Sequence, residues 1–352
     1  MVGAPPCKDF LEPRFHVNPP HYTVQRKLKE LNSLDDYPQV TRDDILAART
    51  RISSSVDRTP LIETMIRGQR LWLKCECLQT GGSFKLRGAT NRLMQLNEEQ
   101  RRRGVVAFSS GNHAQGVAIA AKRLGIPAII VMPADAPGLK VEGTRAQGAE
   151  IIFFDRYSES REEIAKRIAS EKGSIVVPSF DDPHVVAGQG TVGLEVLEQL
   201  EEAGAPPPSQ ILVNCGGGGL SAGIALACPD ADIVVVEPEG WDDMRCSLEL
   251  GEIVPVGPDA PPTLCDALQT PRVSPITFGI LKGRSARGIA VSEDEVATAV
   301  RWAWQTHQLV VEPGGAVSIA ALLAGKAEII SETVVLVSGG NVEPALHARL
   351  VN

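Results

Sequence analysis

The stretch Gln210-Ile-Leu-Val-Asn-Cys-Gly-Gly-Gly-Gly-Leu-Ser221 runs from an apolar strand through four glycines into residues that can open a helix. Such a turn is typical of α/β proteins, and its backbone N–H groups can converge on an anion at the helix N-terminus. The spacing fits neither the dinucleotide fingerprint nor the P-loop, which ends in Gly-Lys-Ser/Thr. We attribute the glycines to binding of a single phosphate and not to packing. The alternative, a flexible linker, is disfavoured by the apolar residues on both sides.

A second glycine turn, Gln79-Thr-Gly-Gly-Ser-Phe-Lys-Leu-Arg-Gly-Ala89, places the amine of Lys85 at the start of an expected helix over residues 86–96. A cation at a helix N-terminus opposes the helix dipole. This position, between Phe84 and Leu86, should lower the lysine pKa and favour a neutral, nucleophilic amine. The alternative is a surface lysine whose stem lies along the protein.

The same order of strand, turn and helix occurs at 105–108, Ser109-Ser-Gly-Asn-His113 and 114–124. Helical patterns lie between most of the strand candidates, which predicts an α/β fold with parallel sheets. Capping boxes that begin at Thr41 and Ser292 predict helices over 42–52 and 296–307. The strand candidates are residues 71–75, 105–108, 128–132, 151–154, 175–177, 211–214, 233–236 and 334–337.

Composition narrows the class of protein. The chain has 352 residues, of which 43% are hydrophobic, and this length can supply sizeable cores. It has no apolar run of the roughly 20 residues that a membrane span needs. A net charge of −8 argues against nucleic-acid and anionic-membrane partners. Seven scattered cysteines lack metal-binding spacing, and no signal peptide is apparent, so we expect reduced thiols in a cytoplasmic protein.

Three further motifs accompany the turns at 79–89, 109–113 and 215–221. They are Gly188-Gln-Gly-Thr191, Glu312-Pro-Gly-Gly315 and Val337-Ser-Gly-Gly-Asn341. In their residues and in their order along the chain, these motifs resemble those of the pyridoxal-phosphate-dependent serine/threonine dehydratase and serine racemase family. The resemblance implies a tryptophan synthase β-like fold (fold type II) with two open parallel-sheet lobes, and a homodimer. It also implies a large cofactor-binding domain over 41–95 and 182–352, and a small domain over 96–181. Residues 1–40 show no clear period and precede the region of resemblance, so we expect an N-terminal arm there.

The resemblance implies pyridoxal 5′-phosphate as cofactor. Lys85 matches the family's Schiff-base lysine, which also removes the α-proton of the substrate. Phe84 would lie against the cofactor ring, and Asn112 would bind its phenolic oxygen. Ser338 matches the residue that contacts the pyridine nitrogen. The remaining cofactor-binding residues implied are Gly216, Gly217, Gly218, Gly219 and Leu220, at the phosphate, and Glu312.

Substrate binding is expected at the turn that follows the strand 105–108. The implied substrate-binding residues are Ser83, Ser109, Ser110, Gly111, Asn112, His113, Arg161 and Thr270. Two of them have structural alternatives: His113 could hold the turn, and Arg161 could lie on a solvated helix face. Ser110 is also a candidate catalytic residue, because it matches the serine that serves the other face of the substrate in serine racemases.

We predict an ammonia-lyase that eliminates water from L-threonine or L-serine and yields a 2-oxo acid and ammonia. A serine hydroxyl at the pyridine nitrogen leaves the ring unprotonated, which favours elimination. The alternatives are an amino-acid racemase, a 3-hydroxyaspartate dehydratase, and a regulatory protein that binds phosphate or the cofactor without catalysis. Asp266-Ala267 stands where the family usually has Asp-Gly, and the added methyl could reshape the substrate pocket.

The segment Glu237-Pro-Glu-Gly-Trp-Asp-Asp243 resembles the family's divalent-cation site. Carboxylates of Glu237 and Asp243, with the carbonyl of Trp241, would suit Mg²⁺ or Ca²⁺. The alternative is a helix start at which acidic residues interact with the dipole.

Overall fold

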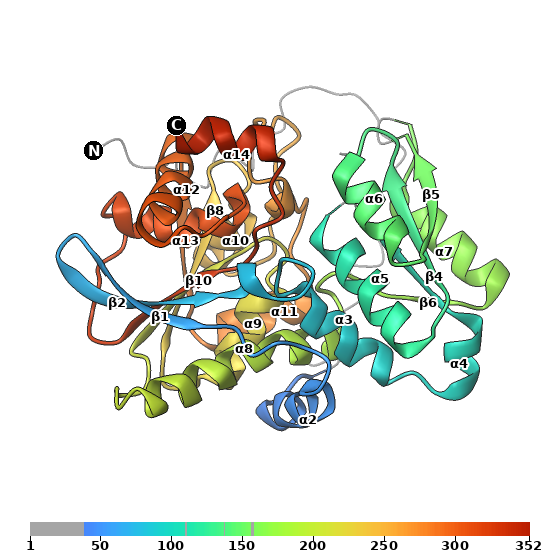
Figure 1. The fold of residues 1–352 in the computed structure, drawn as a ribbon, viewed down its shortest axis with the longest axis horizontal. Helices are drawn as coiled ribbons and strands as arrows, with labels where there is room; N and C mark the ends of the chain where they lie inside the picture. Colours follow the sequence, from blue (N-terminus) through green and yellow to red (C-terminus); the bar gives the residue numbers. More distant parts are fainter. Residues whose placement is uncertain (1–38, 110, 137, 156–157) are drawn as a thin grey trace.

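The computed structural model describes residues 39–109, 111–136, 138–155 and 158–352. Nearly all of the predicted arm, and Ser110, therefore lie outside the described residues. Figure 1 shows two lobes, a larger one that contains the C-terminus and a smaller one built around β3 to β6. Among the described residues, no helix is both long enough and apolar enough to cross a bilayer.

The larger lobe has a six-stranded sheet in the order β1-β2-β10-β7-β8-β9. All neighbours in it are parallel except β1 and β2. These two form a hairpin, because Arg67 and Gly68 both have positive φ and so make a two-residue turn. The strands are β1 (Leu61–Ile66), β2 (Gln69–Cys75), β10 (Thr333–Val337), β7 (Gln210–Asn214), β8 (Asp232–Pro238) and β9 (Arg287–Val291).

The smaller lobe has a parallel four-stranded sheet in the order β5-β4-β3-β6. The α/β class is thus confirmed. Strands β1 and β9 were not predicted, because Glu63 and Thr64 interrupt the apolar run of β1, and β9 begins with Arg287 and Gly288. The strands here are β5 (Glu150–Phe154), β4 (Ala128–Pro133), β3 (Val105–Phe108) and β6 (Ile175–Val176).

The helices follow the glycine turns and caps that the sequence contains. The capping boxes at Thr41 and Ser292 are both present and open α2 and α12. The helices are α2 (Arg42–Ile52), α3 (Lys85–Met94), α4 (Glu98–Arg103), α5 (Asn112–Leu124), α6 (Gly138–Ala146), α7 (Arg161–Lys172), α8 (Pro183–Glu202), α9 (Gly219–Ala227), α10 (Asp243–Leu250), α11 (Pro275–Gly283), α12 (Glu293–His307), α13 (Pro313–Leu323) and α14 (Pro344–Val351), with short 3₁₀ turns at Glu76–Leu78 and Asp266–Leu268.

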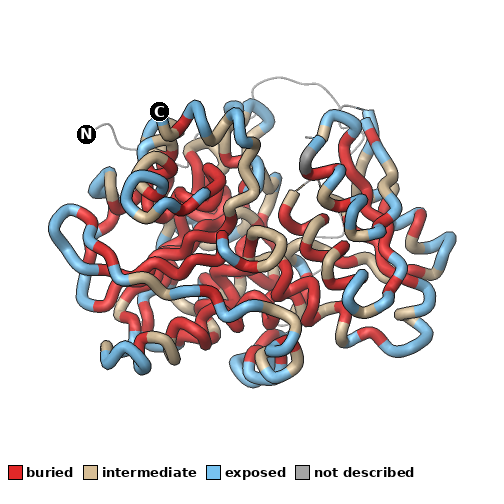
Figure 2. The backbone as a smooth tube through the Cα atoms, in the orientation of Figure 1, coloured by how far each residue is buried: buried red, intermediate tan, exposed pale blue. Residues whose placement is uncertain are grey.

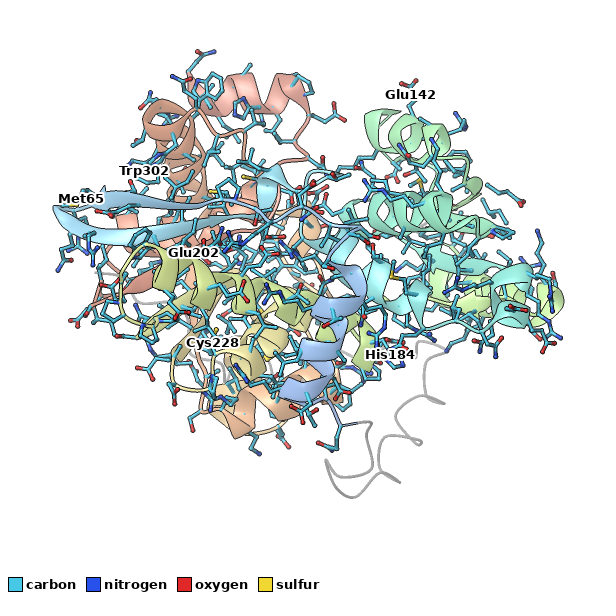
Figure 3. The ribbon with its side chains drawn as sticks, turned by 60° about the horizontal axis from the view of Figure 1, so that its bottom comes forward. Met65, Glu142, His184, Glu202, Cys228 and Trp302 are labelled. Atoms are coloured by element: carbon cyan, nitrogen blue, oxygen red, sulfur yellow. The ribbon has the colours of Figure 1, made fainter. Side chains whose placement is uncertain are left out.

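Alternate residues of the larger sheet face two separate cores. Val213 packs with residues of α8 and α9 on one face, while Leu212 packs with residues of α12 and α13 on the other. Figure 2 shows the resulting buried strands in both lobes. Because both faces are covered, the strands are apolar throughout, which explains why the central ones were recognisable in the sequence. In Figure 3, Met65 on the β1–β2 hairpin lies at the left end of the larger lobe, and Glu142 on α6 lies at the top of the smaller lobe.

Four buried charges join β2, α3 and α8. Arg87, which is fully buried, donates to both oxygens of Glu76 at 2.8 Å and to the two oxygens of Glu195 at 2.7 and 2.9 Å. Lys74 is equally buried and donates to Glu195 at 2.7 Å. Two cations and two carboxylates balance within this quartet, which is the condition under which buried charges are tolerated.

Neutralising one carboxylate of the quartet should be costly. Glu195→Gln leaves two buried cations with one carboxylate, and we expect it to lower the free energy of unfolding by about 3–5 kcal/mol. The control is Glu198→Gln on the same helix, whose ion pair with Arg49 is partly exposed, with an expected loss below about 1 kcal/mol. Urea unfolding followed by circular dichroism measures both. Equal losses in the two variants would contradict a special role of the quartet.

Candidate functional site

The four-glycine turn lies at the carboxyl end of β7, in the centre of the larger sheet, and leads into α9. Gly218 has φ of +84°, a conformation that favours glycine. Within the described chain, the N–H groups of Gly216, Gly217, Gly218 and Gly219 donate no backbone hydrogen bond. Together with the helix dipole, these donors can bind an anion.

The same glycines are also required by packing. A Cβ atom at Gly217 would lie 2.2 Å from Cδ1 of Phe180, and one at Gly218 would lie 2.7 Å from Cε of Met244. A Cβ atom at Gly216 would approach Oγ1 of Thr270 to 3.0 Å. Our expectation that packing plays no part in this run of glycines is therefore wrong, because neighbouring side chains fill the space beside the loop.

Lys85 is the first residue of α3, and its ammonium lies 5.0 Å from the centroid of the Phe84 ring. It donates to the carbonyl of Ser179 at 3.1 Å. Burial lowers the pKa of Lys85 to about 8, while the charge of Glu312 opposes this shift. The predicted lowering agrees with the structure, although the main cause is loss of solvent.

A chain of polar groups links Glu312, Asn112 and Asn341. The amide of Asn112 donates to Oε1 of Glu312 at 2.6 Å, and its oxygen accepts from Asn341 at 2.7 Å. The second carboxylate oxygen of Glu312 is buried and has no hydrogen-bond partner in the described part of the chain. Burial, reinforced by the charge of Asp266, raises the pKa of Glu312 to about 7. This carboxyl group can therefore accept or supply a proton near neutral pH.

Ser338 follows β10 and lies next to the lysine turn. Its carbonyl accepts from the N–H of Phe84 at 3.2 Å, and its hydroxyl accepts from the amide of Asn214 at 3.0 Å. Ser83 forms a β-bridge with Gly339. These contacts bring the lysine turn, the end of β10 and the end of β7 to one edge of the sheet.

The turn after β3 caps α5, with Gly111 as the N-cap residue. The N–H of Gly111 donates to the hydroxyl of Ser109 at 3.2 Å. Nε2 of His113 lies 2.9 Å from the carbonyl of Val177, and Nδ1 has no partner among the described residues. Burial, with the nearby charge of Lys85, lowers the pKa of His113 to about 3. The imidazole is therefore neutral and donates to Val177, which favours its structural alternative.

Thr270 and Arg161, two of the expected substrate-binding residues, lie in different parts of the structure. Thr270 lies beside the glycine loop, as its closeness to Gly216 shows. Arg161 begins α7, pairs with Glu162 at 3.0 Å and lies 5.7 Å from the centroid of the Phe108 ring. Neither of these two partners of Arg161 is a predicted cofactor or substrate residue.

The sequence reasoning missed one cation beside the turn after β3. Nζ of Lys140 lies 3.9 Å from the position that a Cβ atom would take at Gly111, and it pairs with Asp266 across the two lobes. The side chain of Lys140 is 9% exposed and that of Asp266 is 49% exposed. Lys140 was not predicted from the sequence, because it belongs to none of the motifs that follow the predicted strands.

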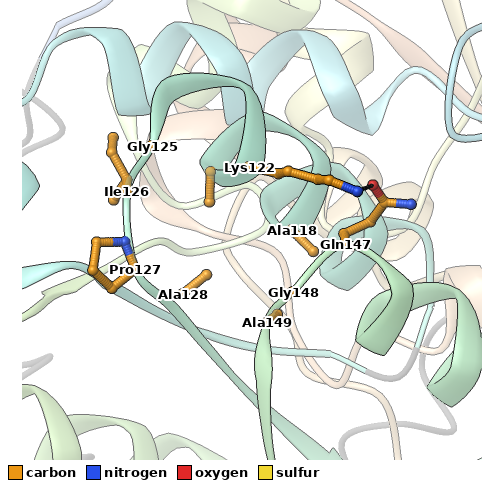
Figure 4. A pocket seen from close by; sticks show the side chains of 10 residues that line it. Ala118, Lys122, Gly125, Ile126, Pro127, Ala128, Gln147, Gly148 and Ala149 are labelled. Atoms are coloured by element: carbon orange, nitrogen blue, oxygen red, sulfur yellow. Dashed lines mark hydrogen bonds between the residues drawn. The ribbon is translucent and has the colours of Figure 1, made fainter.

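A separate cavity lies in the smaller lobe, between the end of α5 and residues 147–149 (Figure 4). Its lining consists of small and apolar residues with Lys122 and Gln147, and includes no predicted site residue.

Comparison with known proteins identifies the family. Residues 52–340 match the model of the pyridoxal-phosphate-dependent enzymes. The chain belongs to this family. It is 39% identical to the serine racemase of Schizosaccharomyces pombe over 321 residues, which cover 89% of this chain and 97% of the racemase. It is 41% identical to the L-threo-3-hydroxyaspartate ammonia-lyase of Pseudomonas sp over 317 residues, covering 88% and 97% of the two chains.

Solved structures agree with this assignment. The structure of maize serine racemase superposes with a TM-score of 0.82 at 36% identity, covering 89% of this chain and 97% of that one. The crystal structure of the T.th. threonine deaminase superposes with a TM-score of 0.79 at 41% identity, covering 87% of this chain and 99% of that one. The resemblance and the fold type inferred from the sequence are thus confirmed. The chain is a pyridoxal-phosphate-dependent enzyme that is similar to both ammonia-lyases and serine racemases.

The expected cation site contains two buried carboxylates. Both oxygens of Glu237 accept backbone N–H groups, from Met244 at 3.1 Å and from Arg245 at 2.8 Å. Oδ2 of Asp243 accepts from Val273 at 2.8 Å, while Oδ1 is buried without a partner among the described residues. Burial and the charge of Asp243 raise the pKa of Glu237. No group of three or more His, Cys, Asp or Glu side chains that could hold a metal occurs in the described residues.

The lowered pKa of Lys85 predicts how cofactor capture depends on pH. Pyridoxal phosphate is an aldehyde that reacts with the neutral amine, so its rate of capture by cofactor-free protein should rise with pH and level off above about 8. Glu312→Gln removes a charge that raises the pKa of Lys85, so the midpoint should move to lower pH. Stopped-flow absorbance measures the rate. A midpoint near the ordinary lysine value of 10.5 would contradict burial of the amine.

Proposed function

We propose that this enzyme eliminates water from a β-hydroxy amino acid, L-threonine or L-serine, and yields a 2-oxo acid and ammonia. The observation that carries the proposal is the amine of Lys85, which lies over Phe84 with its pKa lowered to about 8 by burial. It donates to the carbonyl of Ser179, and the next residue, Phe180, packs against Gly217 of the glycine loop. An idle lysine on the surface would keep its ordinary pKa. This argues against a purely regulatory protein.

The residues at the site fit pyridoxal phosphate. When bound, the cofactor accepts the electron pair released at the α-carbon of the substrate. The free N–H groups of Gly216 to Gly219, with that of Leu220 in the first turn of α9, suit its phosphate. The hydroxyl of Ser338 suits the ring nitrogen, and Asn112, held by Glu312 and Asn341, suits the phenolic oxygen. Phe84 offers an aromatic face beside Lys85.

Lys85 would carry the cofactor and, once substrate displaces it, remove the α-proton with its neutral amine. The substrate carboxylate would lie on the turn 109–113, at the N-terminus of α5, with Ser83 as an additional donor. The half-exposed Arg161 and Thr270 would add contacts to it. Elimination is favoured over racemisation because Ser338 is a neutral donor and not a carboxylate, so that the ring remains a weaker electron acceptor.

A substrate with a second carboxylate is the other candidate. Lys140 supports it, because this buried ammonium lies beside Gly111 and its partner Asp266 is half exposed. An exposed carboxylate loses little when it returns to water, so a substrate carboxylate could replace it. The 41% identity to a 3-hydroxyaspartate ammonia-lyase points the same way. Racemisation, for which the S. pombe relative is named, depends on Ser110.

One assay tests the proposal. Release of 2-oxo acid is measured with L-serine, L-threonine and L-threo-3-hydroxyaspartate, and the remaining amino acid is analysed on a chiral column. We expect kcat/KM to be highest for serine or threonine, and Lys85→Ala to lower kcat by at least roughly 10²–10⁴-fold. Lys282→Ala is the matched control, because Lys282 also lies over a phenylalanine ring and donates to a backbone carbonyl, away from the site.

Three other results of these measurements would point to a different function. Faster formation of D-serine than of pyruvate would make the enzyme a racemase. Preference for hydroxyaspartate, lost in Lys140→Met, would assign the dicarboxylate substrate. A purified protein that takes up no pyridoxal phosphate would contradict the proposal that it catalyses this reaction.

We also infer that Mg²⁺ or Ca²⁺ binds between Glu237 and Asp243, with the carbonyl of Trp241. The partnerless Oδ1 of Asp243 supports this, because a buried carboxylate oxygen needs a compensating charge or donor. Added Mg²⁺ or Ca²⁺ should raise the melting temperature, a chelator should reverse the rise, and Asp243→Asn should abolish it. The exposed Asp230→Asn is the control. An unchanged response in Asp243→Asn would show that any cation binds elsewhere.

Assembly and location rest on the resemblance. We infer a homodimer, which is supported by two exposed apolar side chains, those of Leu78 and Val310. The two lie close in space, because Cys77, the neighbour of Leu78, and the carbonyl of Val310 both border Gly340. Sedimentation of the purified protein measures the assembly. A cytoplasmic location is inferred from the seven cysteines, six of which are buried in the structure as thiols and form no disulfide with one another.

A further inference from the structure

Asn214 is a buried polar residue at the end of the otherwise apolar strand β7. Its amide nitrogen donates to the carbonyl of Gly314 at 2.9 Å and to the hydroxyl of Ser338 at 3.0 Å. Its amide oxygen accepts from the hydroxyl of Ser318. Ser318 and Ser338 are buried as well, so each of these bonds replaces one that water would otherwise supply.

The direction of every bond in this group is fixed by Gly314. A backbone carbonyl can only accept, so the amide nitrogen of Asn214 must face Gly314, and the amide oxygen must face Ser318. Both amide hydrogens are then committed, one to Gly314 and one to Ser338. The hydroxyl oxygen of Ser338 therefore accepts a hydrogen bond from Asn214.

The hydrogen of the Ser338 hydroxyl is not involved in the bond with Asn214. Among the described residues, no acceptor receives it. A hydroxyl that accepts through its oxygen offers its own hydrogen in another direction. Ser338 is thus prepared as a donor, and the group that would receive this hydrogen must carry a lone pair.

We propose that Asn214 is a positioning residue that acts through Ser338 to keep the ring nitrogen of the cofactor unprotonated. The proposal rests on the proposed function, in which Ser338 contacts this nitrogen. A nitrogen that accepts a hydrogen bond is stabilised in its unprotonated form, and its pKa falls. A hydroxyl with the opposite orientation would present its lone pair and stabilise the protonated ring.

Asn214 therefore influences which reaction the enzyme favours. An unprotonated ring accepts less electron density from the α-carbon, so the electron pair released there forms the Cα–Cβ double bond instead. The Cβ–O bond breaks with its own electron pair on the oxygen, which takes up a proton and leaves as water. Racemisation and α-proton exchange benefit from a ring that holds the electrons longer. The orientation of one amide, that of Asn214, would thus separate elimination from exchange.

Asn214→Asp reverses the orientation with almost no change in shape. If the new carboxyl group is ionised, it only accepts, and Ser338 must donate to it. If it is protonated, its single hydrogen goes to the carbonyl of Gly314, and Ser338 again donates toward residue 214. In both cases the lone pair of Ser338 turns toward the ring nitrogen.

The test uses holoenzyme reconstituted with pyridoxal phosphate that carries ¹⁵N in the ring. The ¹⁵N chemical shift reports protonation of that nitrogen directly. We expect the shift of an unprotonated pyridine in the wild type at neutral pH, and a change toward the protonated shift in Asn214→Asp. The ratio of α-proton exchange in deuterated water to 2-oxo acid release should rise, by roughly tenfold for each unit by which the ring-nitrogen pKa increases.

Ser318→Ala is the matched control. It removes a buried hydrogen bond from the same group but leaves the direction from Asn214 to Ser338 intact, so the ¹⁵N shift should remain that of the wild type. A protonated ring nitrogen in the wild type would overturn the proposal without any variant. So would an unchanged shift in Asn214→Asp, or an equal change in Ser318→Ala. If Ser338→Ala leaves the shift unchanged while Lys85 still binds the cofactor, the placement of Ser338 is wrong and the lyase function stands.

Discussion

The balance of charge inside the quartet of Lys74, Glu76, Arg87 and Glu195 is the constraint on which the site depends. Arg87 stands two residues after Lys85 in the first turns of α3, and both of its carboxylate partners belong to other elements. The start of α3 is therefore fixed to the end of β2 and to α8. Because the amine of Lys85 lies at that start, its position relative to the glycine loop is fixed by buried charges that are not among the predicted cofactor-binding residues.

The groups assembled at the edge of the sheet are mostly neutral. Backbone N–H groups, the amides of Asn112 and Asn214 and the hydroxyl of Ser338 supply the hydrogen bonds. The ionisable ones, Lys85 and Glu312, have pKa values of about 8 and about 7. Burial brings the two values close together from opposite sides, so that each group can change its charge without large cost near neutral pH. Such a site can exchange protons with a substrate while it holds few permanent charges.

Much of this was visible in the sequence, and the omissions have physical causes. The central strands, the capped helices and the glycine turns carry local signals, and the structure contains them. Strands β1 and β9 carry weaker signals, because polar residues or glycine interrupt their short apolar runs. Contacts such as that of Lys140 with Asp266 join residues far apart in the chain, and no local pattern predicts them. Asn214 was visible as a polar residue ending an apolar strand, but the direction of its hydrogen bonds depends on the fold.

Phe180 gives the glycine loop a second role. This residue lies in the connection from β6 of the smaller lobe to α8 of the larger one. Its ring fills the space beside Gly217, and its Cβ and backbone lie beside Gly219. The loop, which we propose as the anion site, is therefore also the surface against which the connection between the lobes packs. In evolutionary terms the two tasks restrict each other. A side chain gained at Gly217 would displace the connection, so mutational drift at this position would be selected against even in a descendant that had lost its cofactor.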